Sequence, residues 1–293
     1  MGSREDSSRV VDDSEESVIA RMRGLLTRIK RRLLGSRRET QAASSVAPTM
    51  PLSWAVKQAL GLPEDALHEP VESPRLADLL KESIHDSPRP GWVDLFYVDG
   101  APLPCWEESH TTLYGDWLTR DDTYPVYYVL FRKLTAMKLR TKLLEIGVFT
   151  GYVGAVFARA AQGPAFYVGV DPNLYTSYGL VLAGKTFKTL RVKLANFDFC
   201  LMEGYSWDTH VRNSLIYTAP FDIVHVDGDH TLPGKLMDLE LARQVVGLDG
   251  LVLVDDYEHH DCVRDAIRRA MAMGWFKEFL LVPTHRGLAV LRA

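Results

Sequence analysis

The sequence predicts an α/β fold built on a mostly parallel sheet, with an antiparallel hairpin at its C-terminal end. From about residue 119 onward, short apolar runs typical of strands alternate with helical patterns. This order is typical of a parallel sheet covered by helices. The last two apolar runs, FLLV and LAVL, are separated only by residues 283–287. A parallel crossover needs about a dozen residues or more, so the final strand must return antiparallel.

Three parts are predicted along the chain. Residues 1–51 form a polar and basic extension, in which residues 18–38 carry apolar side chains at helical spacing among arginines and lysines. We interpret this stretch either as a helix that makes weak contact with a membrane surface or docks on a partner, or as a solvated extension. Residues 52–118 are rich in proline and aromatics, and predict a helical and irregular cap whose aromatic side chains either line an acceptor site or simply pack. Residues 119–293 form the main domain.

The composition excludes several classes of protein. A net charge of −4 and a pI near 6.1 leave no overall basic surface for nucleic acid. The three cysteines are scattered without CxxC spacing, which argues against a disulfide framework or a structural zinc site and fits a reducing compartment. No apolar run approaches the roughly 18 residues that span a bilayer. We therefore expect a cytoplasmic protein that binds no nucleic acid and has no transmembrane segment. We also expect it to form a homo-oligomer, a dimer.

The first strand of the main domain leads into a glycine turn, in the stretch LLEIGVFTGYVGAVFARAA. Gly147, Gly151 and Gly154 allow a tight turn and a close approach of the backbone to a ligand. Their spacing departs from GxGxxG, and Glu145 at the strand end suits a cationic amino group, such as that of S-adenosylmethionine, better than a pyrophosphate. The next strand ends at Asp171, where we expect an exposed carboxylate that accepts ribose hydroxyls, a device that a dehydrogenase would share.

Three carboxylates follow two later strands. The buried run FDIVHV leads into Asp227, and LVLV leads into Asp255 and Asp256 at the same edge of the sheet. Two unit charges 4 Å apart repel by about 4 kcal/mol at an effective dielectric of 20, so the cluster needs protons or a cation. Oxygen ligands select Mg²⁺, or Mn²⁺ or Ca²⁺. The alternative is that these acids cap the helices that follow them.

His230 is the predicted general base, because it follows Asp227 by three residues and would face an acceptor bound at this edge. Taking a proton from a phenol of pKa near 10 with an imidazole of pKa near 6.5 is uphill by about 5 kcal/mol. A metal ion must therefore lower the pKa of the acceptor. The alternative is a structural loop residue. His259 and His260 follow the acidic pair and could also reach the site, but they are interpreted as solvated residues before the helix that starts near Asp261.

The stretch EIGVFTGY resembles the first motif of class I S-adenosylmethionine-dependent O-methyltransferases, particularly the metal-dependent caffeoyl-CoA and catechol group. The resemblance covers residues 119–293 and implies a Rossmann-like fold with a seven-stranded sheet. Val153 stands where the family commonly has serine, so another donor, Thr119 or a backbone N–H, must hold the cofactor's carboxylate. The resemblance implies cofactor contacts from Glu145 and the Gly147–Gly151 turn at the methionine part, Asp171 at the ribose, Gly204, Tyr205 and Ser206 beside the adenine, and Asp227.

The resemblance also extends to the acidic edge. Metal-dependent members of the family bind their ion through an Asp after one strand and an Asp-Asn pair after the next, and Asp256 stands at the Asn position. The acidic pair is similar to that of members acting on antibiotic and sugar hydroxyls. His230 stands where the catechol and caffeoyl-CoA enzymes carry a lysine.

The sequence therefore predicts an S-adenosylmethionine-dependent and divalent-metal-dependent O-methyltransferase. Its acceptor would be a hydroxyl of a small molecule such as a phenol, a sugar or another natural product. One alternative is a metal-independent small-molecule methyltransferase of the same fold, in which Asp227 and His230 act directly. The other is a non-catalytic nucleotide-binding or scaffolding protein that works through its basic leader.

Overall fold

The fold is given by a computed structural model that describes residues 50–81, 87–109, 122–173 and 180–293. Met50–Ala293 form one compact unit. The predicted basic helix over residues 18–38 and the candidate donor Thr119 lie outside the described residues.

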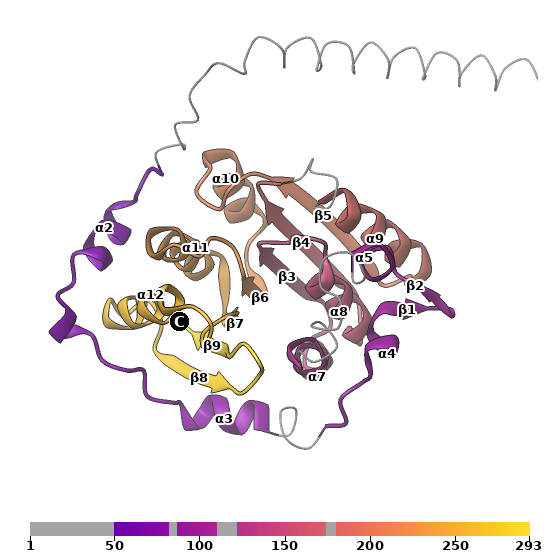
Figure 1. Cartoon of the computed structure of the whole chain (residues 1–293), viewed down its shortest axis with the longest axis horizontal. Coiled ribbons are helices and arrows are strands. Elements are labelled where there is room, and N and C mark those ends of the chain that lie inside the picture. The colour runs from indigo at the N-terminus through magenta and orange to yellow at the C-terminus, as the bar shows by residue number, and fades with distance from the viewer. Residues whose placement is uncertain (1–49, 82–86, 110–121, 174–179) are drawn as a thin grey trace, which may run out of the picture. The chain divides into compact units, whose positions relative to one another are not determined.

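A seven-stranded sheet with the strand order β5-β4-β3-β6-β7-β9-β8 forms the centre of this unit (Figure 1). The strands are β3 (Thr141–Ile146), β4 (Ala165–Asp171), β5 (Phe197–Glu203), β6 (Phe221–Val226), β7 (Val246–Val254), β8 (Glu278–Val282) and β9 (Leu288–Arg292). Strands β3 to β7 pair in parallel, whereas β9 runs antiparallel to both β7 and β8. The predicted Rossmann-like α/β fold, with its mostly parallel sheet and antiparallel C-terminal hairpin, is confirmed.

Helices cover both faces of the sheet. They are α7 (Thr123–Ala136), α8 (Tyr152–Ala160) and α9 (Leu180–Lys193) on one face, and α10 (Thr209–Thr218), α11 (Leu232–Val245) and α12 (Asp261–Ala272) on the other (Figure 1). Successive side chains of a strand point to opposite faces. In β3, buried Leu143 accordingly joins the core beneath α7 and α8, whereas its buried neighbour Leu144 joins the core beneath α11 and α12. A strand that is apolar on both faces is therefore what a central parallel strand requires.

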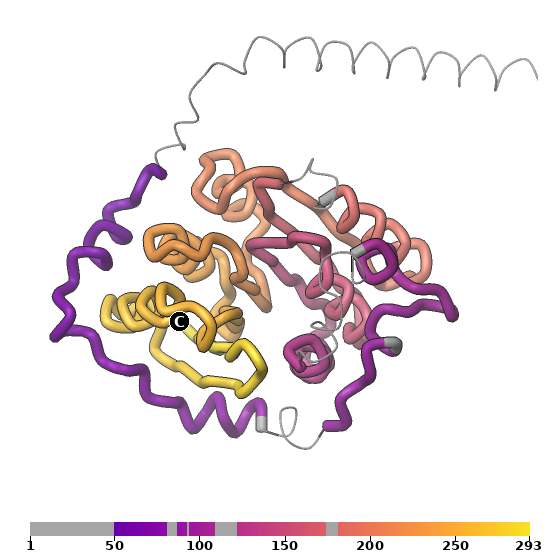
Figure 2. The backbone as a smooth tube through the Cα atoms, viewed as in Figure 1, coloured from indigo at the N-terminus to yellow at the C-terminus, as the bar shows by residue number. Residues whose placement is uncertain are grey.

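The described part of residues 50–109 runs along the outside of the sheet domain (Figure 2). Its elements are α2 (Trp54–Leu60), a 3₁₀ turn (Glu64–Ala66), α3 (Pro74–Lys81), α4 (Trp92–Phe96), β1 (Tyr97–Val98), β2 (Ala101–Pro102) and α5 (Pro104–Ser109). Arg269 of α12 donates to the carbonyls of Ala59 and Leu62, each at 3.0 Å, and Ser73 N–H donates to Phe279 O of β8 at 2.7 Å. The segment is thus bound to the domain rather than folded around a core of its own.

The parallel strands bring the residues that follow them to one edge of the sheet. Asp227 N–H donates to Ile146 O at 2.8 Å, Asp255 N–H donates to Val226 O at 3.2 Å, and Gly147 N–H donates to Val170 O at 2.9 Å. The backbone that follows β3, β6 and β7 is therefore held in register with the neighbouring strand ends. Open α/β sheets place their ligands at this edge.

None of the helices in the described ranges combines the length and apolarity that crossing a membrane would require.

Candidate active site

A pocket of about 270 Å³ opens at the carboxyl ends of β3, β4, β5 and β6. Its wall brings together six of the residues that the sequence assigned to a cofactor, namely Gly147, Asp171, Gly204, Tyr205, Ser206 and Asp227. Sequence reasoning did not find several others, among them Phe149, Asn173, Trp207 and Asp238. Tyr205 and Trp207 stack at 4.6 Å between ring centroids, with an interplanar angle of 13°, so one side of the pocket presents a flat aromatic wall.

Only glycine can occupy position 147. Its φ is +90°, which L side chains rarely adopt, and a Cβ atom there would lie 2.1 Å from the carbonyl oxygen of Asp227. The glycine loop and the loop after β6 therefore touch through their backbones. Gly151 also has a φ of +90° and precedes α8, but it packs against α9 and does not line the pocket.

Asp171 holds the glycine loop through its carboxylate. One oxygen accepts from the N–H groups of Val148 and Phe149 at 3.0 and 2.9 Å, and the other accepts from Asn173 N–H at 2.7 Å. The side chain is buried, so the expectation of an exposed carboxylate is wrong. The reason is that a strand ending against a glycine turn presents backbone donors, and the acid turns inward to accept them. A ribose at this site would meet an acid that is already oriented.

Glu145 lies behind the glycine loop and does not line the pocket. It is fully buried, accepts a hydrogen bond from the Tyr167 hydroxyl, and lies 3.7 Å from Nδ1 of His225. Burial raises the pKa of this carboxyl well above its usual value, and the Tyr167 hydrogen bond opposes the rise only in part. His225 in turn contacts the Tyr127 hydroxyl at 3.0 Å, so these groups form a buried polar network beneath the site.

Asp238 of α11 closes the pocket beside Ser206. The Ser206 hydroxyl donates to one oxygen of its carboxylate, and Asp229 N–H donates to the other at 3.2 Å. Burial raises the pKa of Asp238 to about 6, against the lowering effects of Lys235 and of these hydrogen bonds. Lys235 and Glu240 of the same helix are buried as well, so the sequence did not single out Asp238.

The three predicted carboxylates do meet at one edge, but they differ in their surroundings. Asp227 keeps 25% of its side chain exposed, whereas Asp255 is completely buried. Asp255 Oδ2 lies 2.8 Å from Nη1 of Arg286, and the same nitrogen lies 3.6 Å from Asp256 Oδ1. Arg286 therefore supplies to this pair the positive charge that the sequence argument sought from a metal ion.

The electrostatics follow from burial and from Arg286. Burial raises the pKa of Asp255 to about 8, although the guanidinium opposes this shift. For Asp227, burial also favours the neutral form, but the His230 hydrogen bond and the charge of Arg286 outweigh it and leave the pKa below its usual value. Burial alone would lower the pKa of Arg286, but Asp255 and the other neighbouring acidic groups together outweigh burial, and the pKa of Arg286 is raised. Asp227 is thus the ionised carboxylate that faces the pocket.

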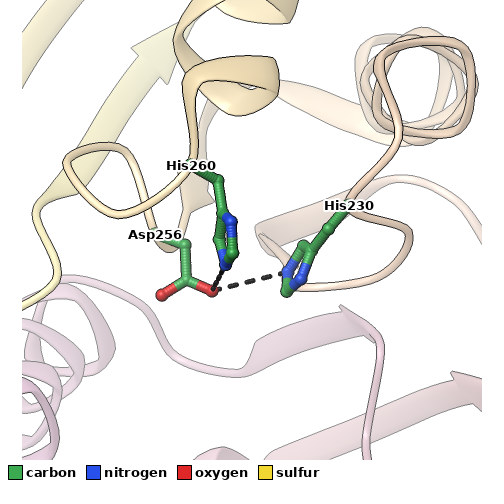
Figure 3. A group of neighbouring side chains, drawn as sticks. All are labelled: His230, Asp256 and His260. Atoms are coloured by element: carbon green, nitrogen blue, oxygen red, sulfur yellow. Dashed lines mark ion pairs between the residues drawn. The ribbon is translucent and has the colours of Figure 1, made fainter.

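His230 lies between two carboxylates. Its Nε2 is 3.5 Å from Asp227 Oδ1 and 3.4 Å from Asp256 Oδ2. His260, interpreted from the sequence as a solvated residue, stacks on His230 with ring centroids 4.6 Å apart, and its Nε2 lies 3.8 Å from the same oxygen of Asp256 (Figure 3). His260 reaches this position through a turn, in which Asp256 adopts a φ of +64° and its carbonyl accepts from the N–H groups of His259 and His260.

Among the described residues of the predicted cap, several aromatic side chains pack against one another. Trp92, Phe96 and Trp106 stack with centroid separations of 5.4 to 5.7 Å, and none of them lines the pocket at the ends of β3 to β6. Tyr124 of α7 connects this cluster to the acidic edge, because it contacts Trp92 and lies 5.6 Å from the Arg286 guanidinium.

Comparison with known proteins agrees with this description. Residues 144–257 match a family described as a methyltransferase domain. No curated protein matches the chain in sequence.

Solved structures with a similar arrangement include a methyltransferase of Podospora anserina bound to S-adenosylhomocysteine. Its sequence identity is 16% and its TM-score is 0.46, and the alignment covers 76% of this chain and 97% of that one. An O-methyltransferase of Bacillus cereus in complex with S-adenosylhomocysteine is 14% identical, with a TM-score of 0.43 over 58% of this chain and 80% of that one. The Streptomyces achromogenes O-methyltransferase of tomaymycin synthesis, in complex with S-adenosylmethionine, is 18% identical, with a TM-score of 0.42 over 58% of this chain and 79% of that one. Identities and TM-scores this low carry no substrate, metal or mechanism over to this chain.

Proposed function

We propose that the chain, of which residues 144–257 match a methyltransferase domain family, is an S-adenosylmethionine-dependent O-methyltransferase acting on a hydroxyl group of a small molecule. One observation supports this proposal above the others. Asp227 lines the cofactor pocket, and its carboxylate also faces His230 at 3.5 Å. The candidate base therefore lies beside the pocket that we propose for the methyl donor. Transfer of the methyl group to a deprotonated oxygen requires this proximity.

In this proposal the acceptor hydroxyl binds at the edge formed by Asp227, His230 and Asp256. His230 takes the hydroxyl proton at a ring nitrogen, and the oxygen attacks the sulfonium methyl group in line. Asp227 and Asp256 orient the imidazole and stabilise it once it is charged, as carboxylates do beside catalytic histidines. For a phenol the proton transfer is uphill by about 5 kcal/mol without further help.

A divalent ion is the proposed source of that help, and part of the predicted ligand set suits it. Asp227 and Asp256 have carboxylate oxygens at the pocket edge, whereas Asp255 is buried and bound to Arg286. Two carboxylates plus waters make a typical Mg²⁺ site. When bound, the ion would lower the pKa of the acceptor hydroxyl. We therefore propose Asp227 and Asp256 as its ligands and assign Asp255 to holding Arg286.

The metal-independent alternative is favoured by one specific observation, the position of Arg286. This guanidinium already neutralises part of the acidic cluster, with Nη1 at 2.8 Å from Asp255 and 3.6 Å from Asp256. Dialysis against EDTA separates the two proposals. Loss of activity that Mg²⁺ restores supports the metal-dependent enzyme, whereas undiminished activity supports the alternative.

The proposal is tested by measuring S-adenosylhomocysteine formation with a panel of hydroxylated small molecules. Acceptors are first selected by thermal shift with S-adenosylmethionine and Mg²⁺ present. Asp227→Asn should abolish turnover. Asp249→Asn, which changes an exposed acid near the start of β7, is the matched control and should retain it. Equal turnover by the Asp227 variant and the wild type would contradict the proposal.

A further inference from the structure

We propose that the acidic edge also binds a borderline divalent ion, such as Zn²⁺, Co²⁺ or Ni²⁺, through His230, His260 and Asp256, and that this ion inhibits methyl transfer. The binding part of the inference rests on geometry alone. The inhibitory part rests on the proposed function, because it requires His230 to act as the base.

Three potential ligand atoms surround one point. The Nε2 atoms of His230 and His260 lie 3.4 and 3.8 Å from Asp256 Oδ2, and the three ligand atoms all lie within 4.8 Å of one another. Figure 3 shows both imidazoles directed at this single oxygen. Neither distance is that of a short hydrogen bond. The other oxygen of the Asp256 carboxylate faces Arg286 at 3.6 Å, so Oδ2 is the atom left for an ion.

The spacing is close to what a single ion would impose. Ligand atoms that bind Zn²⁺ at about 2.0 to 2.1 Å are separated by about 2.9 to 3.4 Å, depending on the coordination geometry. The observed separations from Asp256 Oδ2 are 3.4 and 3.8 Å. The separation between the two imidazole nitrogens is at most 4.8 Å, so closing the site around an ion requires relative shifts of at most about 1.5 to 2 Å between two side chains that are 39 and 44% exposed.

The two loops that carry the imidazoles are fixed relative to each other. The Cys262 thiol, in the first turn of α12, donates to the carbonyl of His230 at 2.9 Å. The His260 N–H donates to the carbonyl of Asp256 at 3.1 Å, which holds the third ligand beside the second. Because the backbone is tied at both positions, little conformational freedom remains to be lost when an ion binds.

The chemistry of the set selects against Mg²⁺. Imidazole suits zinc, copper, iron and nickel, whereas carboxylate and water suit Mg²⁺, Ca²⁺ and Mn²⁺. A hard ion would therefore use Asp227 and Asp256 and leave His230 available for the acceptor proton. A borderline ion would take the lone pair of His230 Nε2, and the base would be lost. The same edge thus distinguishes ions by whether they bind imidazole.

The binding test is calorimetric titration of ZnCl₂ and of MgCl₂ into the full-length protein without cofactor or acceptor. Variants are His260→Gln and, as a matched control, His68→Gln, which changes an exposed histidine outside the cluster. Even partners that only orient a metal ligand contribute about 10- to 100-fold to affinity, so loss of the His260 ligand should weaken Zn²⁺ binding at least about tenfold. Mg²⁺ affinity should stay unchanged in all three proteins. Equal Zn²⁺ affinity for wild type and His260→Gln, or an equal loss in the control, would overturn the inference.

The inhibition test uses Mg²⁺-supported methyl transfer. Each protein's rate is normalised to its own rate without Zn²⁺, and the Zn²⁺ concentration for half inhibition should rise at least about tenfold in His260→Gln but not in His68→Gln. Unchanged sensitivity in His260→Gln would refute the inhibitory role. If no acceptor supports turnover, the proposed function fails, while the titrations still decide whether the ion site exists.

Discussion

The buried carboxyl of Asp238 should make stability depend on pH in a way that one substitution removes. Its pKa in the folded protein is raised by burial to about 6, against about 3.9 in an unfolded chain. The folded state therefore binds this proton more tightly than the unfolded state. The resulting stabilisation is fully present below about pH 4 and is lost as the pH rises through about 6. Asp238→Asn does not titrate and lacks this dependence.

The size of the effect follows from the two pKa values. Between pH 5 and pH 7.5, the difference in unfolding free energy between wild type and Asp238→Asn should shift by about 1.4 kcal/mol, with the wild type losing stability as pH rises. Urea denaturation of both proteins at several pH values in this range, without cofactor, measures the shift. The comparison cancels the titration of all groups that the two proteins share. A difference that stays constant from pH 5 to pH 7.5 would refute this account of Asp238.

Three further predictions concern the site. Arg286→Met should destabilise the fold by about 1 to 3 kcal/mol, because it leaves the buried Asp255 carboxyl without the partner that lies 2.8 Å away. Adding Asp255→Asn should recover part of the loss in a denaturation cycle, and no recovery would contradict the pairing. Asp171→Ala should weaken S-adenosylmethionine binding, measured by calorimetry. It should also lower the melting temperature of the cofactor-free protein, because the Asp171 carboxylate accepts from three backbone N–H groups. An unchanged cofactor affinity would rule out the placement of Asp171 at the cofactor. His230→Ala should lower kcat by about 10² to 10⁴, and less at high pH for a phenolic acceptor that ionises by itself; wild-type kcat from pH 6 to 9, with chemistry limiting, would eliminate the base role.

The fold could be predicted from the sequence because its signals are local. The run FDIVHV places apolar residues on both faces, and β6 is largely buried on both faces between two parallel neighbours. The five residues between the last two apolar runs are too few for a crossover, and β9 pairs antiparallel with β8. The methyltransferase prediction, drawn from the glycine turn, the antiparallel C-terminal hairpin and the resemblance of EIGVFTGY, agrees with the match of residues 144–257 to a methyltransferase domain family.

The parts of the site that sequence reasoning missed depend on contacts between distant segments. Arg286 lies in a hairpin loop, and it reaches Asp255 only because Glu258 N–H donates to its carbonyl at 2.9 Å and holds the two loops together. His260 reaches His230 through a turn with a positive φ at Asp256, a conformation that is uncommon outside glycine although aspartate adopts it more often than most residues. An arginine in the loop between the last two predicted strands was the sequence signal for the first contact, and the place of His260 four residues after Asp256 was the signal for the second.

The central claim, that this pocket holds a methyl donor beside a proton acceptor, is tested most directly by calorimetric titration of S-adenosylmethionine into the full-length protein, with NAD titrated in parallel. The account predicts binding of one S-adenosylmethionine per chain, weakened in Asp171→Ala, and no binding of NAD, because the glycine spacing departs from the dinucleotide pattern. Binding of NAD with no binding of S-adenosylmethionine would contradict the account.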